Sequence, residues 1–201
     1  MHQSSTALLI SIALVGTAAY VVETRAQQGA GTLIDQRSSG MGQFAGQSRR
    51  PAPSWKNQSW LNADHPFTLE ELRGRVVLLN FWVFTCYNCT NTVPSLVDLD
   101  RKYREKGLTI IGIHTPEFPP YAGEHDKGNL ERALKKQGIE YPNAQDNDNT
   151  TWNLYGIRYW PSFVLIDKKG TIRYEGAGEF HLNDGEYASW ERHIQELLAE
   201  P

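Results

Sequence analysis

Residues 81–89 read FWVFTCYNC and contain both cysteines of the chain, Cys86 and Cys89. The apolar run VVLL at residues 76–79 leads into this stretch, and a helix-like pattern follows it. A buried strand that ends in Cys-x-x-Cys at the start of a helix is typical of redox-active sites. The same spacing also permits an inert disulfide, although closing so short a loop would add little stability.

The segments around this stretch alternate between strand and helix patterns. We expect strands at residues 76–82, 108–114, 162–167 and 171–175, and an extended piece from Tyr141. We expect helices from Cys89 to about Gly107 and at residues 129–137, 147–155 and 187–198, with Asn183 or Asp184 as the last N-cap. This order, β-α-β-α-β-β-α, predicts an α/β domain with a mixed central sheet and helices on both faces.

The N-terminal part of the chain has a different character. An uncharged apolar run at residues 7–22 is shorter than the roughly 20 residues of a transmembrane helix and fits the core of a secretory signal. We therefore expect residues 1–26 to be a signal peptide or an N-terminal membrane anchor. Residues 27–62, rich in Gly, Gln and Ser, are expected to be a flexible linker, in which Trp55 and Trp60 pack onto the domain edge. The folded domain is expected at residues 63–201.

Composition excludes several classes of function. The formal net charge of −3 gives no reason to expect nucleic acid as a partner. Two cysteines cannot form a zinc site without histidine help, and the six histidines are scattered. We therefore expect no metal and no cofactor. An open alternative is a binding module, either redox-silent or holding copper with two thiolates and a histidine.

Several motifs together resemble the thioredoxin fold. They are the Cys-x-x-Cys after a buried strand, Pro94 in the following helix, Trp160-Pro161 before a strand, and the terminal ββα order. Residues 72–82, LRGRVVLLNFW, look like the exported TlpA-like thioredoxins. Residues 112–118, GIHTPEF, and residues 158–161, RYWP, are similar to the C-terminal redox domain of DipZ-type proteins. The resemblance spans residues 67–198.

The resemblance implies an exported thiol–disulfide oxidoreductase, periplasmic or otherwise extracytoplasmic, with a cis Trp160–Pro161 bond that faces the cysteines. It also implies a reductant that acts on cysteine-containing exported proteins, with a membrane electron donor as a further partner. A peroxidase of the related redoxin class is disfavoured, because such enzymes use a single cysteine in a Pro/Thr-rich loop. Two positions depart from cytoplasmic thioredoxins: Tyr87-Asn88 replaces Gly-Pro, and Asn80 stands where they carry a buried Asp.

The two cysteines are expected to have different roles. Cys86 faces solvent at the end of the strand, where the N-terminus of the helix favours its thiolate. It would attack a disulfide and form a mixed disulfide. Cys89, one turn into the helix, would resolve that intermediate.

Glu117 is the candidate proton acceptor. It follows the strand that ends at His114, and neighbouring parallel strands end at the same side of a sheet, so Glu117 is expected beside Cys86. It would take the proton of Cys89, which Asn80 cannot do. A solvated loop glutamate is the alternative, and His114 is expected to be a core residue.

The substrate-binding surface is expected to form from residues near the sulfur atoms. These residues are Trp82, Tyr87, Trp160 and Pro161. For Trp82, packing in the core is an equal alternative.

Overall fold

In a computed structural model of the protein, which describes residues 43–201, strand β3 (Val76–Trp82) lies in the middle of a seven-stranded sheet. All seven of its residues are buried, as its apolar sequence predicts for a strand covered on both faces. β3 pairs in parallel with β4 (Leu108–His114) and antiparallel with β6 (Ser162–Ile166). The cysteines therefore follow directly from the most enclosed part of the sheet.

The other strands extend the sheet to both sides. They are β1 (Gln43–Pro51), β2 (Trp60–Leu61), β5 (Asn143–Gln145) and β7 (Thr171–Ala177). The strand order is β1-β7-β6-β3-β4-β5-β2, in which β4 and β5 are parallel and the outer pairs are antiparallel. The mixed sheet and the β6–β7 hairpin confirm the sequence prediction.

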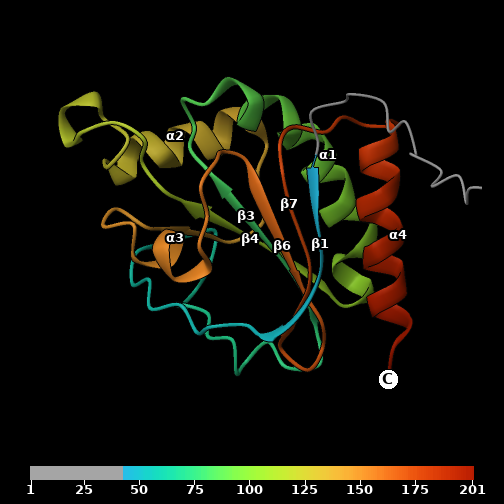
Figure 1. The fold of residues 1–201 in the computed structure, drawn as a ribbon. Coiled ribbons are helices and arrows are strands. Elements are labelled where there is room, and N and C mark those ends of the chain that lie inside the picture. The colour runs from blue at the N-terminus through green and yellow to red at the C-terminus, as the bar shows by residue number, and fades with distance from the viewer. Residues whose placement is uncertain (1–42) are drawn as a thin grey trace, which may run out of the picture. The chain divides into compact units, whose positions relative to one another are not determined.

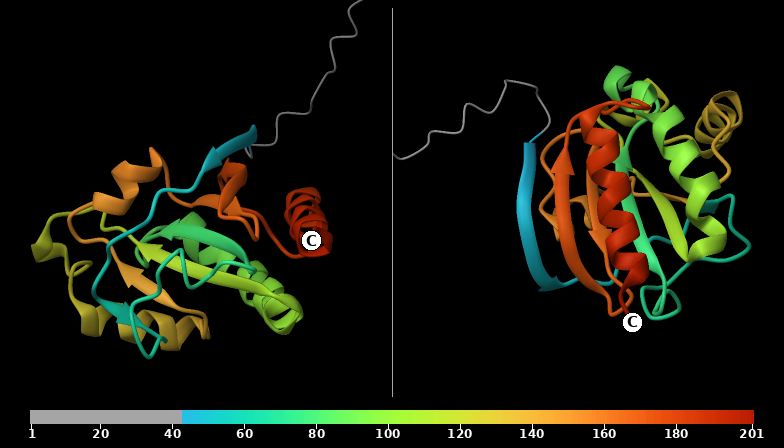
Figure 2. Two further views of the ribbon diagram at one scale, coloured as in Figure 1. Left: turned by 90° about the horizontal axis from the view of Figure 1, so that it is seen from below. Right: turned by 90° about the vertical axis from the view of Figure 1, so that its right-hand side faces the viewer.

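Helices cover both faces of this sheet. Because side chains alternate along a strand, Val76 and Leu78 of β3 contact one hydrophobic cluster, whereas Val77 and Leu79 contact another. The first cluster includes residues of α1 (Tyr87–Tyr103), α2 (Lys127–Gln137) and α4 (Gly185–Ala199). The second includes residues of α3 (Thr150–Tyr155). Helices α1 and α4 lie side by side, as Figures 1 and 2 show.

Two helix boundaries lie where the local sequence predicts them. Asp184 is the N-cap of α4 and accepts a hydrogen bond from the Tyr187 N–H at 2.7 Å. Gly138, with φ of 68°, ends α2 in the left-handed region that glycine adopts without strain. Helix α2 begins two residues before the expected Asn129, because the side chain of Asp126 accepts from the Asn129 N–H and caps the first turn. Short 3-10 helices occupy Arg104–Lys106 and Pro120–Ala122.

The segment expected to be a linker divides into two parts. The predicted leader at residues 1–26 and the linker up to residue 42 lie outside the described residues. The rest differs from the expectation, because β1 pairs with β7 and β2 pairs with β5. Trp55 and Trp60 are buried in the second cluster, as expected, so the ordered domain begins before residue 63.

The strand register defines two ends of the sheet. The cysteine end is the level at which Trp82, His114, Gln145 and Ser162 lie on neighbouring strands. The hairpin end is the opposite level, at Val76, Leu108 and the turn 167–170 between β6 and β7. The C-terminus lies close to the hairpin end (Figure 1), where Lys168 Nζ donates to the carbonyl of Leu198 at 2.9 Å.

Among the residues that the structure describes, no helix has the length and apolar character needed to cross a bilayer.

Candidate active site

Cys86 is the N-cap residue of α1. Its backbone is extended, with φ of −72° and ψ of 118°, and its N–H closes a turn on the carbonyl of Val83 at 3.2 Å. Its Sγ accepts a hydrogen bond from the Cys89 N–H at 3.2 Å, in the position where a helix cap usually places an oxygen. Cys86 is half-buried, whereas Cys89 is only 2% exposed. The helix thus presents one sulfur to solvent and keeps the other inside.

The two thiols differ in acidity for physical reasons. A hydrogen bond from the Cys89 thiol lowers the pKa of Cys86 to about 7, with further help from the N–H groups of Cys89 and Asn88. Burial raises the pKa of Cys89 far above its ordinary value, and the negative charge developing on Cys86 adds to that rise. Near neutral pH Cys86 is therefore partly a thiolate, while Cys89 keeps its proton.

Glu117 acts electrostatically on both sulfurs. Its charge raises the pKa of Cys86 and also the pKa of Cys89, although other causes are larger in each case. The side chain is exposed in the loop after β4. The structure therefore brings Cys86, Cys89 and Glu117 into one electrostatic neighbourhood at the cysteine end.

His114 supports the loop in front of Cys86. It is fully buried, and its Nε2 accepts a hydrogen bond from the Phe84 N–H at 3.3 Å. Its ring stacks on Phe84 and meets Trp82 edge-on. Burial lowers the pKa of His114 to about 3, so the ring is neutral. His114 is a core residue, as the sequence predicts, and its bond to the Phe84 N–H also positions the loop.

Trp160 and Pro161 precede β6, and Trp160 packs against the same hydrophobic cluster as Cys86. The Trp160–Pro161 peptide bond is cis, which confirms the expectation from the family. Trp160 Nε1 donates to the carbonyl of Thr115 at 3.1 Å, and its ring stacks on Trp152 at 4.2 Å between centroids. The hydrogen bond attaches the segment before β6 to the loop that carries Glu117, and the stacking attaches it to α3.

Trp82 does not lie on the surface, contrary to the prediction that it contacts substrate. Its side chain is fully buried, and its Nε1 donates to Asn143 Oδ1 at 2.9 Å. Gly112 makes this bond sterically possible, because a Cβ there would lie 2.0 Å from Asn143 Oδ1. Trp82 lies in the same hydrophobic cluster as Cys89, and Cys86 packs against that cluster.

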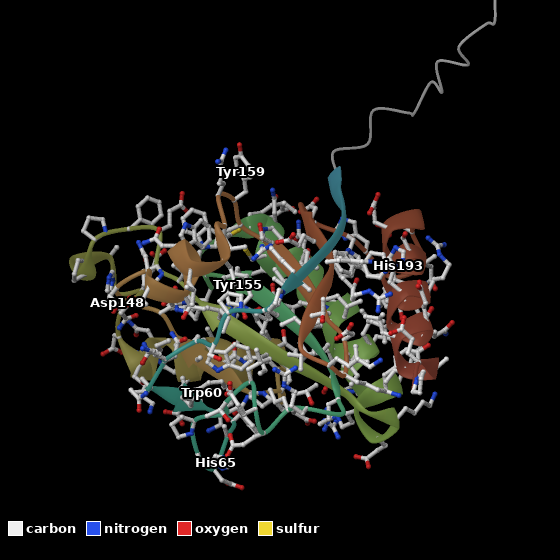
Figure 3. The ribbon with its side chains drawn as sticks, turned by 60° about the horizontal axis from the view of Figure 1, so that its bottom comes forward. Trp60, His65, Asp148, Tyr155, Tyr159 and His193 are labelled. Atoms are coloured by element: carbon white, nitrogen blue, oxygen red, sulfur yellow. The ribbon has the colours of Figure 1, made fainter. Side chains whose placement is uncertain are left out.

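Exposed aromatic side chains gather in the segments at the cysteine end. Tyr87 is 76% exposed, Phe118 is 49% exposed and Tyr159 is 68% exposed. Tyr159 projects away from the body of the domain in Figure 3. Sequence reasoning selected Tyr87 but missed Phe118 and Tyr159. Their only signal was adjacency to Glu117 and to Trp160.

Glu124 is a second residue that sequence reasoning missed. It is fully buried, and its carboxylate accepts hydrogen bonds from the Thr85 hydroxyl and from the N–H groups of Glu117 and Phe118. In the sequence it stands in a polar segment, AGEHDKG. Nothing in that segment distinguishes Glu124 from a solvated loop glutamate.

The copper alternative requires ligands beyond the two thiolates. Across residues 43–201, no group of three or more His, Cys, Asp and Glu side chains is placed to hold a metal ion.

Comparisons with known proteins agree with this geometry. The model of the AhpC/TSA family matches residues 49–175. Protein DipZ of Mycobacterium tuberculosis is 41% identical over 150 residues, which is 73% of this chain and 20% of DipZ. The thiol-disulfide oxidoreductase ResA of Bacillus anthracis is 32% identical over 111 residues, 55% of this chain and 60% of ResA.

The fold has solved counterparts. The crystal structure of a thiol:disulfide interchange protein of the thioredoxin family from Chlorobium tepidum superposes with a TM-score of 0.59 and 25% identity. That match covers 76% of this chain and 98% of the other. The chain spans only about a fifth of the length of the DipZ relatives.

Proposed function

This chain belongs to the AhpC/TSA family, and from that premise we propose that it is an exported thiol–disulfide oxidoreductase that reduces disulfides in other proteins. The observation that carries the proposal is the contrast between the two sulfurs. Cys86 is half-exposed with its pKa lowered to about 7, and Cys89 is buried one turn away with its N–H bonded to Cys86. A dithiol of this kind has an attacking sulfur and a resolving sulfur.

The proposed reaction has two exchange steps. The Cys86 thiolate attacks one sulfur of the partner disulfide, that S–S bond breaks, and the partner's other sulfur leaves as a thiolate and takes a proton. Cys89 then loses its proton and attacks Cys86, which forms the Cys86–Cys89 disulfide and releases the second partner thiol. The partner gains two electrons and the Cys86–Cys89 pair loses two.

Glu117 is the proposed acceptor of the Cys89 proton. Its charge influences both thiols, and its loop lies at the cysteine end. Asn80, which is buried in β3, has an amide that cannot take up a proton in its place. As the Cys86 thiolate is consumed in the mixed disulfide, one cause of the raised pKa of Cys89 disappears, and transfer to Glu117 becomes easier.

The proposed substrate surface consists of Tyr87, Trp160 and Pro161. Tyr87 is exposed beside Cys86, and Trp160 is attached to the loop of Glu117 through Thr115. Trp82 contributes from below by packing. Cysteine-containing exported proteins are the proposed partners. A membrane dithiol donor is the proposed source of the electrons that reduce the Cys86–Cys89 disulfide again.

The proposed location is extracytoplasmic, with the chain either free or held by its N-terminal segment. The support is the apolar run at residues 7–22 followed by a polar stretch. Expression of the full chain, followed by osmotic-shock and membrane fractionation, tests this. Recovery only from the cytosol would contradict it.

The activity is tested by reduction of insulin with dithiothreitol as the electron source. We expect the wild-type protein to accelerate insulin precipitation, Cys86→Ser to remove the acceleration, and Cys89→Ser to accumulate a mixed disulfide on non-reducing gels. An unchanged rate with Cys86→Ser would contradict the proposal. The reduction potential of the pair against glutathione then tests the direction, for which we expect a reductant.

A further inference from the structure

We propose that Glu124 is a positioning residue that holds the loop of Glu117 at a fixed distance from Cys86, and so controls how strongly Glu117 acts on the two thiols. The inference rests on the proposed function in one respect, the role of Glu117 in thiol chemistry. It is carried by three hydrogen bonds, which we call the Glu124 bridge.

The Glu124 bridge connects the two loops that carry the reactive groups. Oε1 accepts from the hydroxyl of Thr85, the residue directly before Cys86. Oε2 accepts from the N–H of Glu117 at 2.8 Å and from the N–H of Phe118 at 2.7 Å. One side chain therefore contacts the residue before the attacking cysteine, the candidate proton acceptor, and the exposed aromatic residue beside it.

A carboxylate suits this position because all three partners are donors. Two of them are backbone N–H groups in a loop that has no ladder to satisfy them, and the carboxylate offers acceptors without bringing a donor of its own. The side chain is fully buried and its three donors are neutral. Burial of a carboxylate is unfavourable unless hydrogen bonds compensate for lost hydration. The hydrogen bonds that compensate for the burial of Glu124 therefore come from the two loops that carry Cys86 and Glu117.

The backbone around Glu124 is itself held in place. The chain after Phe118 forms the 3-10 helix Pro120–Ala122, and Gly123 turns it back with φ of 84°. The Gly123 carbonyl accepts from Asn129 Nδ2 at 2.8 Å, in the first turn of α2. A Cβ at Gly123 would lie 2.9 Å from that same nitrogen. Helix α2 therefore supplies the rigid support from which Glu124 reaches the loops.

A second side chain, His114, also holds the loop before Cys86, but it attaches that loop to a different part of the fold. His114 binds the N–H of Phe84, so consecutive residues before Cys86 are held from the β4–α2 segment by two different side chains. His114 fixes the loop to β4. The Glu124 bridge fixes Thr85 to the segment that carries Glu117.

The test measures the acidity of Cys86 through the pH dependence of its alkylation by iodoacetamide in the reduced protein. Glu117 raises the pKa of Cys86, so Glu117→Gln should make Cys86 react about threefold faster at pH 6. Variants that release the loop of Glu117 should also increase the alkylation rate of Cys86. We expect Thr85→Val and Glu124→Ala to increase the rate at pH 6, and neither to add to the effect of Glu117→Gln.

Matched controls separate positioning from general damage. Thr85→Ser keeps the hydroxyl, and Glu124→Gln keeps an oxygen for the two N–H groups while its amide donates to the Thr85 oxygen, so both should behave like the wild type. Thr85 is exposed, which makes its variants informative even if Glu124→Ala fails to fold. Equal profiles for Thr85→Val and Thr85→Ser, or effects that add to Glu117→Gln, would overturn the proposal.

Alkylation of Cys86 does not need a protein substrate. The positioning role of Glu124 and the proposed oxidoreductase function can therefore be contradicted independently. Insulin reduction that depends on Cys86 but shows no coupling between Thr85 and Glu117 would overturn the positioning role alone. Coupling without insulin reduction would overturn the proposed function alone.

Discussion

At the hairpin end of the sheet, charged side chains are paired with one another and with the backbone. Asp167 accepts hydrogen bonds from the N–H groups of Lys169 and Thr171, both at 2.9 Å. Arg173 Nη1 lies 3.3 Å from Asp167 Oδ2 and 2.7 Å from Glu200 Oε2. Arg75 donates to the carbonyls of Arg104 and Leu108. Polar groups at this end stabilise the turn and the strand starts.

The cysteine end uses the same strands differently. Tyr87, Phe118 and Tyr159 are exposed, a thiol with a lowered pKa faces solvent, and the fully buried Glu124 holds loops without a cationic donor. Exposed aromatic side chains and a buried carboxylate do not maximise stability. The contrast indicates that one end of the sheet is built for stability and the other for reaction.

The largest expected effect separates activity from stability at the cysteine end. Cys86→Ser should reduce insulin-reduction activity on the order of 10³-fold or more. Because the side chain is half-exposed, the free energy of unfolding of the reduced protein at pH 7 should change by less than about 0.5 kcal/mol. Urea unfolding of reduced wild type and variant measures the second quantity. If Cys86→Ser lost stability as well as activity, the cysteine end would also be needed for stability and the contrast with the hairpin end would fail.

Asp167→Ala should give the reverse result at the hairpin end. It leaves two N–H groups without their acceptor and removes one of the two carboxylate partners of the Arg173 guanidinium, so the free energy of unfolding should fall by about 1–3 kcal/mol. Thermal unfolding at pH 7 measures the loss, and Asp167→Asn, which keeps one acceptor oxygen, should lose less. Insulin reduction at 25 °C should stay at the wild-type rate; a large decrease would show that the ends are coupled.

Burial of His114 at the cysteine end should make the free energy of unfolding depend on pH. Burial lowers the pKa of His114 to about 3, whereas the unfolded chain binds the proton near pH 6.5. The contribution of neutral His114 to the free energy of unfolding is therefore fully present above about pH 6.5. It decreases as pH falls toward 3, by up to about 1.4 kcal/mol per pH unit. His114→Gln retains an acceptor for Phe84 and should flatten this slope in urea titrations between pH 4 and pH 7. An unchanged slope would assign the acid sensitivity to other groups.

The smallest expected effect concerns the linkage of Cys86 to stability. The pKa of Cys86 is lowered to about 7 from an ordinary value of 9.0, so its stabilising contribution is complete above pH 9 and is lost as pH falls through 7. The unfolding free energy of the reduced wild type, relative to Cys86→Ser, should rise between pH 7 and pH 9. The rise should stay below about 1 kcal/mol, because solvent screens a half-exposed group. A decrease over that range would reverse the assignment of the lowered pKa.

Much of the fold follows from local patterns. The continuous apolar run of β3, the Asp184 cap and the glycine after α2 each have a signal within a few residues. β1 has none, because QFAGQSRRP lacks strand-forming periodicity and pairs with β7 through its backbone. A strand that depends on a neighbour's free hydrogen-bonding edge cannot be predicted from its own side chains.

The candidate site divides in the same way. Cys86, Cys89 and Glu117 were identified because spacing and strand order bring them to one end of the sheet. Glu124 was missed because its burial depends on the turn at Gly123 and on α2, and no short-range pattern encodes these together. For Trp82 the sequence left substrate contact and core packing as equal alternatives, and its complete burial in β3 decides for packing.

The two outer strands of the sheet have a consequence for self-association. β2 has only two residues, and β1 ends with exposed Arg49, Arg50 and Pro51, of which Arg50 pairs with Glu175 at 2.7 Å. Short edges, charged edges and proline all discourage another chain from adding a strand. Within the described residues 43–201, both outer edges of the sheet therefore disfavour edge-to-edge association with a second copy of the domain.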